Sequence, residues 1–465
     1  MGNYHFIVNN LPTIKREFYL FSTTSNETIL WHKPTLSIYT LDETNTKFFK
    51  LLLKNNTEEI NEILTVLPNS ENTINQLKQL LSIKTVTKNH VERLALLVSQ
   101  ECPLKCVYCY ANGGTYGEGG LMNISTLENT LTVFYNLYGY IETIQLFGGE
   151  PLLNLKAIKK LIETLKILTN EKKISASPKI SLETGLGVSQ KNVEELVKLI
   201  KDNSSLFEFE IVVSLDGPEI IQNTLRPFKD GSPSYNRVIE NLDILRNIYQ
   251  PKAIEVTYTK KHLEFGFSRE DLKNFFAQKL GITSLMIVPV ISNHPDLLIG
   301  TDLFTNSVID ILKLIEKLKT SRKFENQDEI SKRIKVYLSN IFNSNPTEYF
   351  CGAGITSFAV SAQGDIYPCQ LVVGKNKFKI ANVNDDLSEV SKKLEVMKEK
   401  YKVLNSKSND TMCKECFLEY LCEGCVFEEH VLGKSSDATI PHEYCKIKME
   451  IVKKIFDEKV WEWLY

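Results

Sequence analysis

The sequence predicts an α/β fold in which helices cover a parallel sheet, and three observations lead to this prediction. From residue 92 onward, short apolar runs alternate with amphipathic helical stretches. The runs are almost continuously apolar, which is typical of parallel strands buried on both faces. Each run ends in a polar or glycine-rich turn, such as "GGEP" and "SLDGP". Because ligands bind at the carboxyl ends of parallel strands, we expect the functional site there.

The first element of this region is a strand, and six β/α repeats follow one another along the chain. Helices between the strands are indicated by apolar spacing of three and four residues, as in 158–165 and 193–200. The spacing leaves open whether the helices cover one face of the sheet or both. The six strands are expected at 94–98, 143–147, 179–183, 209–214, 254–259 and 285–291.

Residues 1–90 are predicted to form a separate unit of strands followed by helices. Apolar runs at 5–8, 18–21 and 36–41 predict the strands. Asp42 and Thr57 stand where helix N-caps belong. This layout is that of a winged-helix-like module. The three helices are indicated by the spacing of Phe48, Phe49 and Leu52, of Ile60, Ile63, Leu64 and Leu67, and of Ile74, Leu77, Leu80 and Leu81.

Composition indicates an ordinary globular protein. The 465 residues are enough for two or three domains of about 100–200 residues each. Hydrophobic residues make up 43% of the chain and the net charge is −2, so no basic field favours nucleic acid or an anionic membrane. No apolar stretch approaches the roughly 18–20 residues of a membrane helix, and no signal peptide is recognisable. The expected compartment is the cytoplasm.

The ten cysteines are clustered, which favours metal ligation over disulfides in a reducing cytosol. Cys102, Cys106 and Cys109 follow the first strand directly, in the spacing C-x3-C-x2-C. Thiolates are soft ligands that suit zinc or iron–sulfur centres, and three of them leave one position open for a substrate. A structural zinc knuckle and packing cysteines are the alternatives.

This motif, with Tyr108 just before the last cysteine, resembles the radical S-adenosylmethionine (radical SAM) superfamily. The resemblance implies a partial (β/α)6 TIM-like barrel. It also implies that Cys102, Cys106 and Cys109 hold a [4Fe–4S] cluster whose fourth iron binds S-adenosylmethionine (SAM). Reduction of such a cluster cleaves SAM to a 5′-deoxyadenosyl radical.

Two further motifs resemble the same superfamily. In "FGGEP", Gly148 and Gly149 allow close approach of a ligand to the backbone, and Glu150 offers a carboxylate to the SAM ammonium. In "SLDGP", Ser214 and Asp216 are expected to bind ribose or other polar groups of SAM. Arg226 is expected to pair with the SAM carboxylate.

The end of the third strand departs from the superfamily pattern. Many relatives carry Thr-Asn-Gly there, whereas this chain has Glu183-Thr184-Gly185. Thr184 is kept as a candidate SAM contact, and the departure leaves its role open.

The other seven cysteines lie beyond residue 350, and their pattern resembles the SPASM domain of radical SAM enzymes that modify peptides and proteins. The implied ligands are Cys413, Cys416, Cys422 and Cys445 for one auxiliary [4Fe–4S] cluster. Cys351, Cys369 and Cys425 would hold a second one. A three-thiolate SAM cluster and two four-thiolate clusters need one cysteine more than the ten present. The open iron is expected to take a substrate thiolate or an Asp or Glu side chain. A pair of zinc ribbons is the alternative.

The stretch 41–64 resembles the recognition element of ribosomal-peptide maturases, which binds a leader peptide as an added strand. A DNA-binding winged helix would have a similar pattern, but no Lys/Arg-rich recognition helix is present. The predicted parts are 1–90 for precursor-peptide recognition, 91–302 for the radical SAM barrel, 303–345 for a helical bridge and 346–465 for the SPASM domain.

Together the resemblances imply a maturase of the sactipeptide or ranthipeptide type, which forms a thioether between a cysteine sulfur and a carbon of a precursor peptide. Three [4Fe–4S] clusters, SAM and an electron donor such as flavodoxin or ferredoxin are expected. Alternatives are carbon–carbon cross-linking, sulfatase-type formylglycine maturation, and a zinc-stabilised, non-catalytic peptide- or DNA-binding protein. No catalytic acid or base is identified from the sequence.

Overall fold

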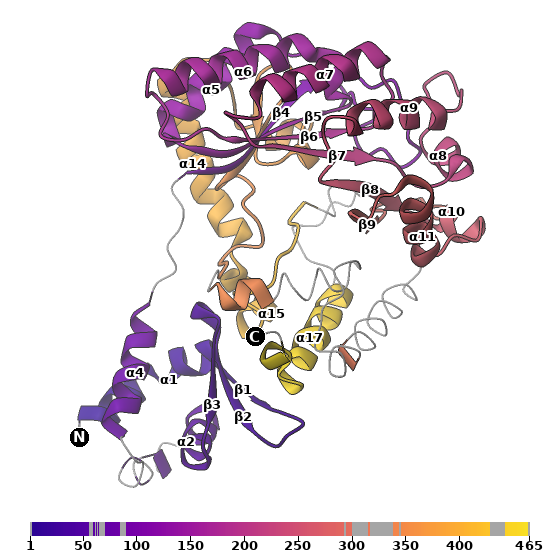
Figure 1. Ribbon diagram of the computed structural model, residues 1–465. Coiled ribbons are helices and arrows are strands. Elements are labelled where there is room, and N and C mark those ends of the chain that lie inside the picture. Colours follow the sequence, from indigo (N-terminus) through magenta and orange to yellow (C-terminus); the bar gives the residue numbers. More distant parts are fainter. Residues whose placement is uncertain are drawn as a thin grey trace.

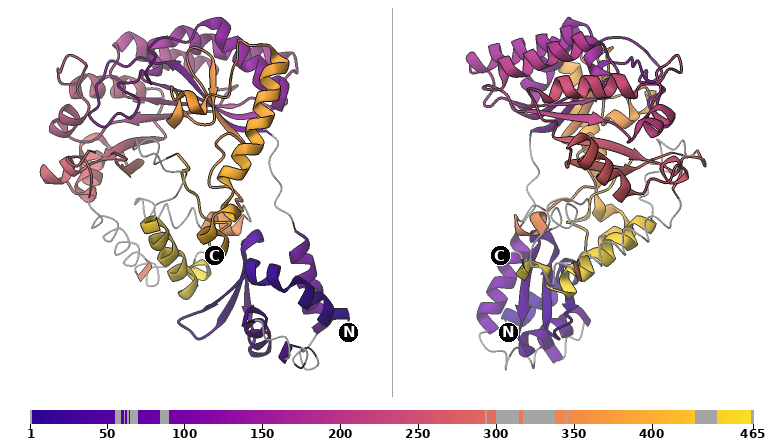
Figure 2. Two further views of the ribbon diagram at one scale, coloured as in Figure 1. Left: turned by 180° about the vertical axis from the view of Figure 1, so that it is seen from behind. Right: turned by 45° about the vertical axis from the view of Figure 1, so that its right-hand side comes forward.

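The computed structural model places three parts one after another along the chain: an N-terminal unit, a large α/β part and a C-terminal cysteine-rich part (Figure 1). The N-terminal unit and the large sheet lie at opposite ends of the molecule, with α14, α15 and α17 between them (Figure 2). The structure describes residues 2–54, 59, 60, 62, 64, 70–83, 90–292, 294–299, 315, 316, 338–343, 346–427 and 442–463.

The N-terminal unit begins with a helix that the sequence did not predict. Helix α1 spans Gly2–Glu17 and contains the apolar run 5–8, which we expected to be a strand. That prediction was wrong because the buried side chains Ile7, Leu11 and Ile14 follow helical spacing, one or two turns apart. A short local run of apolar residues does not show this longer period.

The rest of the unit is an antiparallel sheet followed by helices. Its strands β1 (Phe18–Ser22), β2 (Thr28–His32) and β3 (Ser37–Leu41) pair in this order, and β2 was not predicted. Helices α2 (Glu43–Lys54) and α4 (Ser70–Ser82) confirm the first and last predicted helices. Asp42 caps α2 by accepting from Asn45 N at 2.7 Å. Thr57, Ile63 and Leu67 lie outside the described residues.

The large sheet contains all six predicted strands, which pair in parallel in chain order. They are β4 (Val91–Ser99), β5 (Ile141–Gly148), β6 (Lys179–Thr184), β7 (Phe209–Ser214), β8 (Ala253–Tyr258) and β9 (Leu285–Pro289). The helices of this part are α5 (Ile124–Tyr138), α6 (Leu155–Asn170), α7 (Gln190–Asn203), α8 (Glu219–Leu225), α9 (Tyr235–Arg246), α10 (Lys260–Glu264) and α11 (Arg269–Leu280).

Figure 1 shows α5, α6 and α7 along one face of β4–β7, which answers the question of which faces the helices cover. Strand residues on this outer face, such as Leu96, Leu146 and Leu182, are buried in the main hydrophobic core. The alternate positions form the inner face. On that face Gln145 of β5 lies opposite Ser181 of β6, and Ser214 of β7 lies opposite Glu255 of β8. The inner face is therefore much more polar than the outer one.

Three short strands extend the sheet beyond β4 and were not predicted. Strand β10 (Ser357–Val360) pairs in parallel with β4, with Ser357 opposite Arg93. Strands β11 (Asp365–Tyr367) and β12 (Ala381–Asn382) follow in antiparallel pairing. The cysteine-rich part thus shares one nine-stranded sheet with the α/β part.

The remaining elements of the cysteine-rich part are mostly helical. They are α14 (Leu387–Asn405), α15 (Thr411–Glu415) and α17 (His442–Asp457). Short 3₁₀ helices occupy Lys33–Thr35, Pro151–Asn154, Gln370–Val372, Asn376–Phe378, Lys407–Asn409 and Val460–Trp463. Of the predicted helical bridge 303–345, residues 315, 316 and 338–342 are described and are helical. No helix among the described residues is long and apolar enough to cross a membrane.

The N-terminal unit docks on the cysteine-rich part through a buried interface. Trp31 Nε1 donates to the carbonyl of Phe417 at 2.9 Å, and Phe21 stacks on Phe456. Beside this apolar contact, the buried carboxylate of Glu419 accepts from Lys33 Nζ at 3.0 Å and from Arg16 Nη2 at 2.9 Å.

We predict that Glu419→Gln weakens this docking. Lys33 is almost fully buried, so loss of the carboxylate removes the charge that neutralises its ammonium, at a cost of about 3–5 kcal/mol. Thermal unfolding should show a lower first transition, and small-angle scattering should show a more extended particle. The matched control is Glu27→Gln, which removes the ion pair between the exposed Glu27 carboxylate and Lys459 at the same interface and should change both measurements much less. Equal changes of unfolding temperature and particle size in the two variants would contradict the role of Glu419 in docking.

Candidate active site

The loop that carries Cys102, Cys106 and Cys109 leaves the end of β4 and is held on two sides by backbone hydrogen bonds. On one side, Gly149 N donates to Ser99 O at 2.7 Å and Glu150 N donates to Glu101 O at 2.8 Å. On the other side, Val107 N donates to the carbonyl of Leu225 at 2.9 Å. The three cysteines therefore lie at the carboxyl end of the sheet, between the ends of β5 and α8.

Two glycines allow this close approach. Gly148 has φ +128°, and a Cβ there would lie 2.1 Å from Ser99 O. A Cβ on Gly149 would lie 2.4 Å from Glu101 O. The sequence predicted that these glycines admit a ligand, whereas the group that the structure brings against them is the cysteine loop itself.

The thiols of this loop lie in a partly buried environment. Burial raises the pKa of Cys102 to about 12, and the nearby charge of Glu150 adds to the shift. Burial also raises the pKa of Cys106, while Arg226 opposes the shift. A bound metal centre would deprotonate such thiols outright. Among the described residues, no three His, Cys, Asp or Glu side chains are arranged to hold a single metal ion.

Glu150 joins the end of β5 to the end of β6. Its buried carboxylate accepts from the hydroxyl of Thr184 at 2.8 Å, from Gly185 N at 3.0 Å and from Leu152 N at 3.1 Å. Burial raises the pKa of Glu150, and these hydrogen bonds lower it. The contact of Thr184, whose role the sequence left open, is therefore with Glu150. Binding of SAM by either residue stays a prediction.

Tyr108, Asp216 and Arg226 form a buried network beside the cysteine loop. The Tyr108 hydroxyl donates to Asp216 Oδ2 at 2.6 Å and accepts from Arg226 Nη1 at 2.7 Å. Asp216 Oδ1 accepts from Thr257 N at 3.0 Å, and the side chain is fully buried. Asp216 thus positions Tyr108, and its predicted contact with ribose stays a prediction. Ser214 ends β7 in register with Glu255.

Arg226 offers a test of whether an anionic ligand fits this site. Its Nε is buried and has no hydrogen-bond partner among the described residues. A buried N–H without an acceptor is uncommon in proteins and marks a place where a ligand can bind. A carboxylate such as that of SAM is the acceptor that a guanidinium binds best, so the residues fit the cofactor that the motifs imply.

The seven remaining cysteines fall into two neighbourhoods. Burial raises the pKa of Cys413 to about 12, and the charges of Cys445 and Cys422 add to the shift. Burial also raises the pKa of Cys416 and of Cys445, and the charge of Cys422 adds to both shifts. The structure therefore brings these four thiols near one another.

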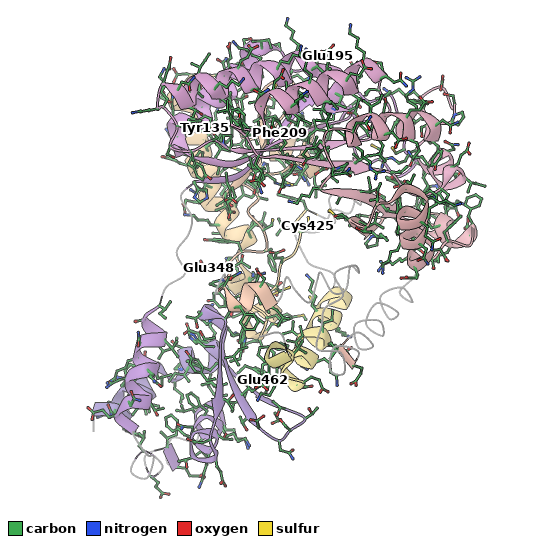
Figure 3. All side chains as sticks on the ribbon, viewed as in Figure 1. Tyr135, Glu195, Phe209, Glu348, Cys425 and Glu462 are labelled. Carbon is green, nitrogen blue, oxygen red and sulfur yellow. The ribbon has the colours of Figure 1, made fainter. Side chains whose placement is uncertain are left out.

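Cys351 and Cys369 interact with each other, and Gly424 N donates to the carbonyl of Phe350 at 3.0 Å, which brings the segment that carries Cys425 beside Cys351. Figure 3 shows Cys425 on the side of the sheet away from α5, α6 and α7. The assignment of the two groups to separate clusters stays a prediction.

The sequence analysis missed the polar side chains of the inner face. Gln145 and Glu255 stand inside apolar strand runs, Arg93 directly precedes the first run, and Glu183 was noted only as a departure from the superfamily pattern. A polar residue at every second position of a buried strand was the available signal.

Comparisons with known proteins agree with this geometry. Residues 96–262 match the radical SAM superfamily, and residues 351–417 match an iron–sulfur cluster-binding domain, SPASM. The chain is 24% identical over 361 residues to the cysteine-type anaerobic sulfatase-maturating enzyme of Clostridium novyi, covering 72% of this chain and 88% of that one. It is 24% identical over 239 residues to the radical SAM cyclopropyl synthase TigE of Paramaledivibacter caminithermalis, covering 48% and 47%.

A solved structure shares the fold. Native anSMEcpe with bound AdoMet and Cp18Cys peptide superposes with a TM-score of 0.60 at 20% identity, covering 80% of this chain and 98% of that one. The predicted α/β fold with a C-terminal SPASM domain is thereby confirmed. The two matched families imply SAM and [4Fe–4S] clusters as cofactors.

We predict that Gly149→Ala displaces the cysteine loop and lowers the iron bound at Cys102, Cys106 and Cys109. The added Cβ collides with the backbone of Glu101, so the loop and its hydrogen bonds must move. Iron analysis after anaerobic reconstitution should show a loss of roughly four irons per chain. The control is Gly119→Ala, where the nearest atom to the new Cβ is 3.8 Å away. Full iron content in Gly149→Ala would contradict this account of the glycine pair.

Proposed function

We propose that this chain, a radical SAM enzyme with a SPASM domain, matures a ribosomally synthesised peptide by joining a cysteine sulfur to a carbon in a thioether. The observation that carries the proposal is the grouping of the C-terminal cysteines. Four of them lie near one another, and Cys351, Cys369 and Cys425, if they hold a second cluster, would leave it one thiolate short. A substrate cysteine is a fitting fourth ligand.

A peptide substrate is supported by the relatives and by the N-terminal unit. One relative is a sulfatase-maturating enzyme, and the solved structure of similar fold contains a bound peptide. In the N-terminal unit, β3 pairs with β2 on one side only among the described strands. Such an edge accepts a peptide as an added strand through main-chain hydrogen bonds. We therefore assign leader-peptide binding to this edge.

The residues of the sheet end have distinct tasks in this proposal. Cys102, Cys106 and Cys109 would hold a [4Fe–4S] cluster, which would supply the electron for reductive cleavage of SAM. Arg226 would offer its unpartnered Nε to the SAM carboxylate, and Asp216 positions Arg226 through Tyr108. Glu150 and Thr184 hold the ends of β5 and β6 together. The electron is expected from a flavodoxin or ferredoxin.

Formylglycine maturation of a sulfatase is the second candidate, because the relative from Clostridium novyi carries that function in its name. Enzymes of this type typically have an additional cysteine between the first two SPASM positions. This chain has none between Cys351 and Cys369. The thioether assignment therefore explains the cysteine count better.

Anaerobic co-expression with a precursor peptide tests the proposal by mass spectrometry. A thioether makes the peptide lighter by two hydrogen atoms and removes one thiol that reacts with iodoacetamide. The triple variant Cys102→Ala, Cys106→Ala, Cys109→Ala should leave the precursor unmodified, because the SAM-binding cluster is lost. A precursor that keeps all its thiols would rule out the thioether, and an aldehyde in place of a thiol would establish formylglycine maturation instead.

A further inference from the structure

The inner face of the sheet carries a connected row of polar side chains that the SAM site does not use. Glu183 Oε1 accepts from Gln145 Nε2 at 2.6 Å, and Gln145 Oε1 accepts from Arg93 Nη1 at 3.3 Å. Arg93 Nη2 in turn donates to Gln370 Oε1 at 3.1 Å, next to Cys369. The row thus runs from β6 across β5 and β4 to the group of Cys351, Cys369 and Cys425.

Two tyrosines that follow Cys109 interact electrostatically with Glu183. Tyr110 and Tyr116 follow Cys109, and their hydroxyls are 3.4 Å apart. Burial raises the pKa of both phenols, and the charges of Glu183 and Cys109 add to each shift. The charge of Cys369 also raises the pKa of Tyr110. Glu183 therefore interacts electrostatically with Tyr110 and Tyr116, and these tyrosines also interact with Cys109.

The surroundings of Glu183 suit a carboxylate that exchanges a proton near neutral pH. Burial and the charge of Glu255 raise its pKa to about 7, while the Gln145 hydrogen bond and Arg93 lower it. Oε2 of Glu183 accepts no hydrogen bond from the described residues, so one oxygen is available to a substrate. General bases work best when their pKa lies near the working pH. The ionisable groups that face Glu183 are Arg93, Glu255, Tyr110 and Tyr116.

Glu255 is a second buried acid on this face, but it lies near Asp216 and Arg226. Burial raises its pKa, and its charged neighbours are Arg226 and Asp216. It is also in register with Ser214. Glu183 is therefore the acid on this face that is connected to the auxiliary cysteine group.

We propose that Glu183 accepts the proton of the substrate cysteine thiol at the inner face of the sheet. The S–H bond breaks, its proton binds Oε2 of Glu183, and the electron pair stays on sulfur as a thiolate. The thiolate is the form of cysteine that binds a metal. This inference rests on the proposed function, because the thiol belongs to the precursor peptide.

The test compares wild type, Glu183→Gln and Glu210→Gln as reconstituted holoenzymes acting on the co-expressed precursor between about pH 5.5 and 8.5. Wild-type product formation should fall about tenfold per pH unit below about pH 7, since the protonated carboxyl cannot accept a proton. Glu183→Gln should lose at least about 100-fold in product and show no such acid limb. Glu183→Gln should still release 5′-deoxyadenosine from SAM in the absence of the peptide. Glu183→Asp should recover part of the rate and the acid limb.

Glu210→Gln is the matched control. Glu210 lies on the same face of β7, at the amino end of the strand, where it pairs with Lys179 and Lys252. This variant should keep the wild-type pH profile.

Thermal unfolding of the holoenzymes provides a readout independent of activity. The pKa of Glu183 is raised in the folded state, so wild type should lose stability relative to Glu183→Gln as pH rises between about 4.5 and 7. Unchanged product formation and an unchanged acid limb in Glu183→Gln would overturn the inference alone. Failure of wild type to form any product would overturn the proposed function and the inference with it.

Discussion

The parallel pairing of β4 with β10 fixes the position of the loop with Cys102, Cys106 and Cys109 relative to the segment that carries Cys369. β4 is also paired with β5, so one strand joins the two parts of the chain that carry cysteines. The loop with Cys102, Cys106 and Cys109 leaves the end of β4, and Cys369 follows β11, which pairs with β10. Gln100 strengthens the junction, because its side chain donates to Thr115 O and accepts from Ala362 N. The cysteine loop and the SPASM region therefore cannot move independently without breaking the sheet.

This shared sheet has two faces of opposite character. The outer face is apolar and packs under α5, α6 and α7, and its burial supplies most of the favourable free energy of folding. The inner face carries Arg93, Gln145, Glu183 and Glu255 in a partly buried environment, where polar groups reduce stability unless they are paired. Most of these groups have partners within the row. A row of this kind suits a ligand that needs polar contacts and proton exchange.

Much of this architecture could be predicted from local sequence patterns. The strands β4–β9 were predicted because each is a nearly continuous apolar run, and the cysteine spacing indicated the site at the end of β4. Other elements depend on distant contacts. β10, β11 and β12 are very short, and β10 exists through its pairing with β4, far away in the sequence. Residues 5–8 were assigned to a strand because the helical period of Ile7, Leu11 and Ile14 extends beyond that run. The hydrogen bond between Gln145 and Glu183 depends on the register of two strands, which the sequence pattern does not define.

Cys102, Cys106 and Cys109 are proposed to form the centre at which SAM is cleaved. The most direct test is release of 5′-deoxyadenosine by the anaerobically reconstituted, dithionite-reduced protein supplied with SAM. The account predicts 5′-deoxyadenosine from wild type and none from a variant with all three cysteines replaced by alanine, which should still bind iron at the C-terminal cysteines. Intact SAM in the wild-type reaction, or zinc in place of iron, would contradict it.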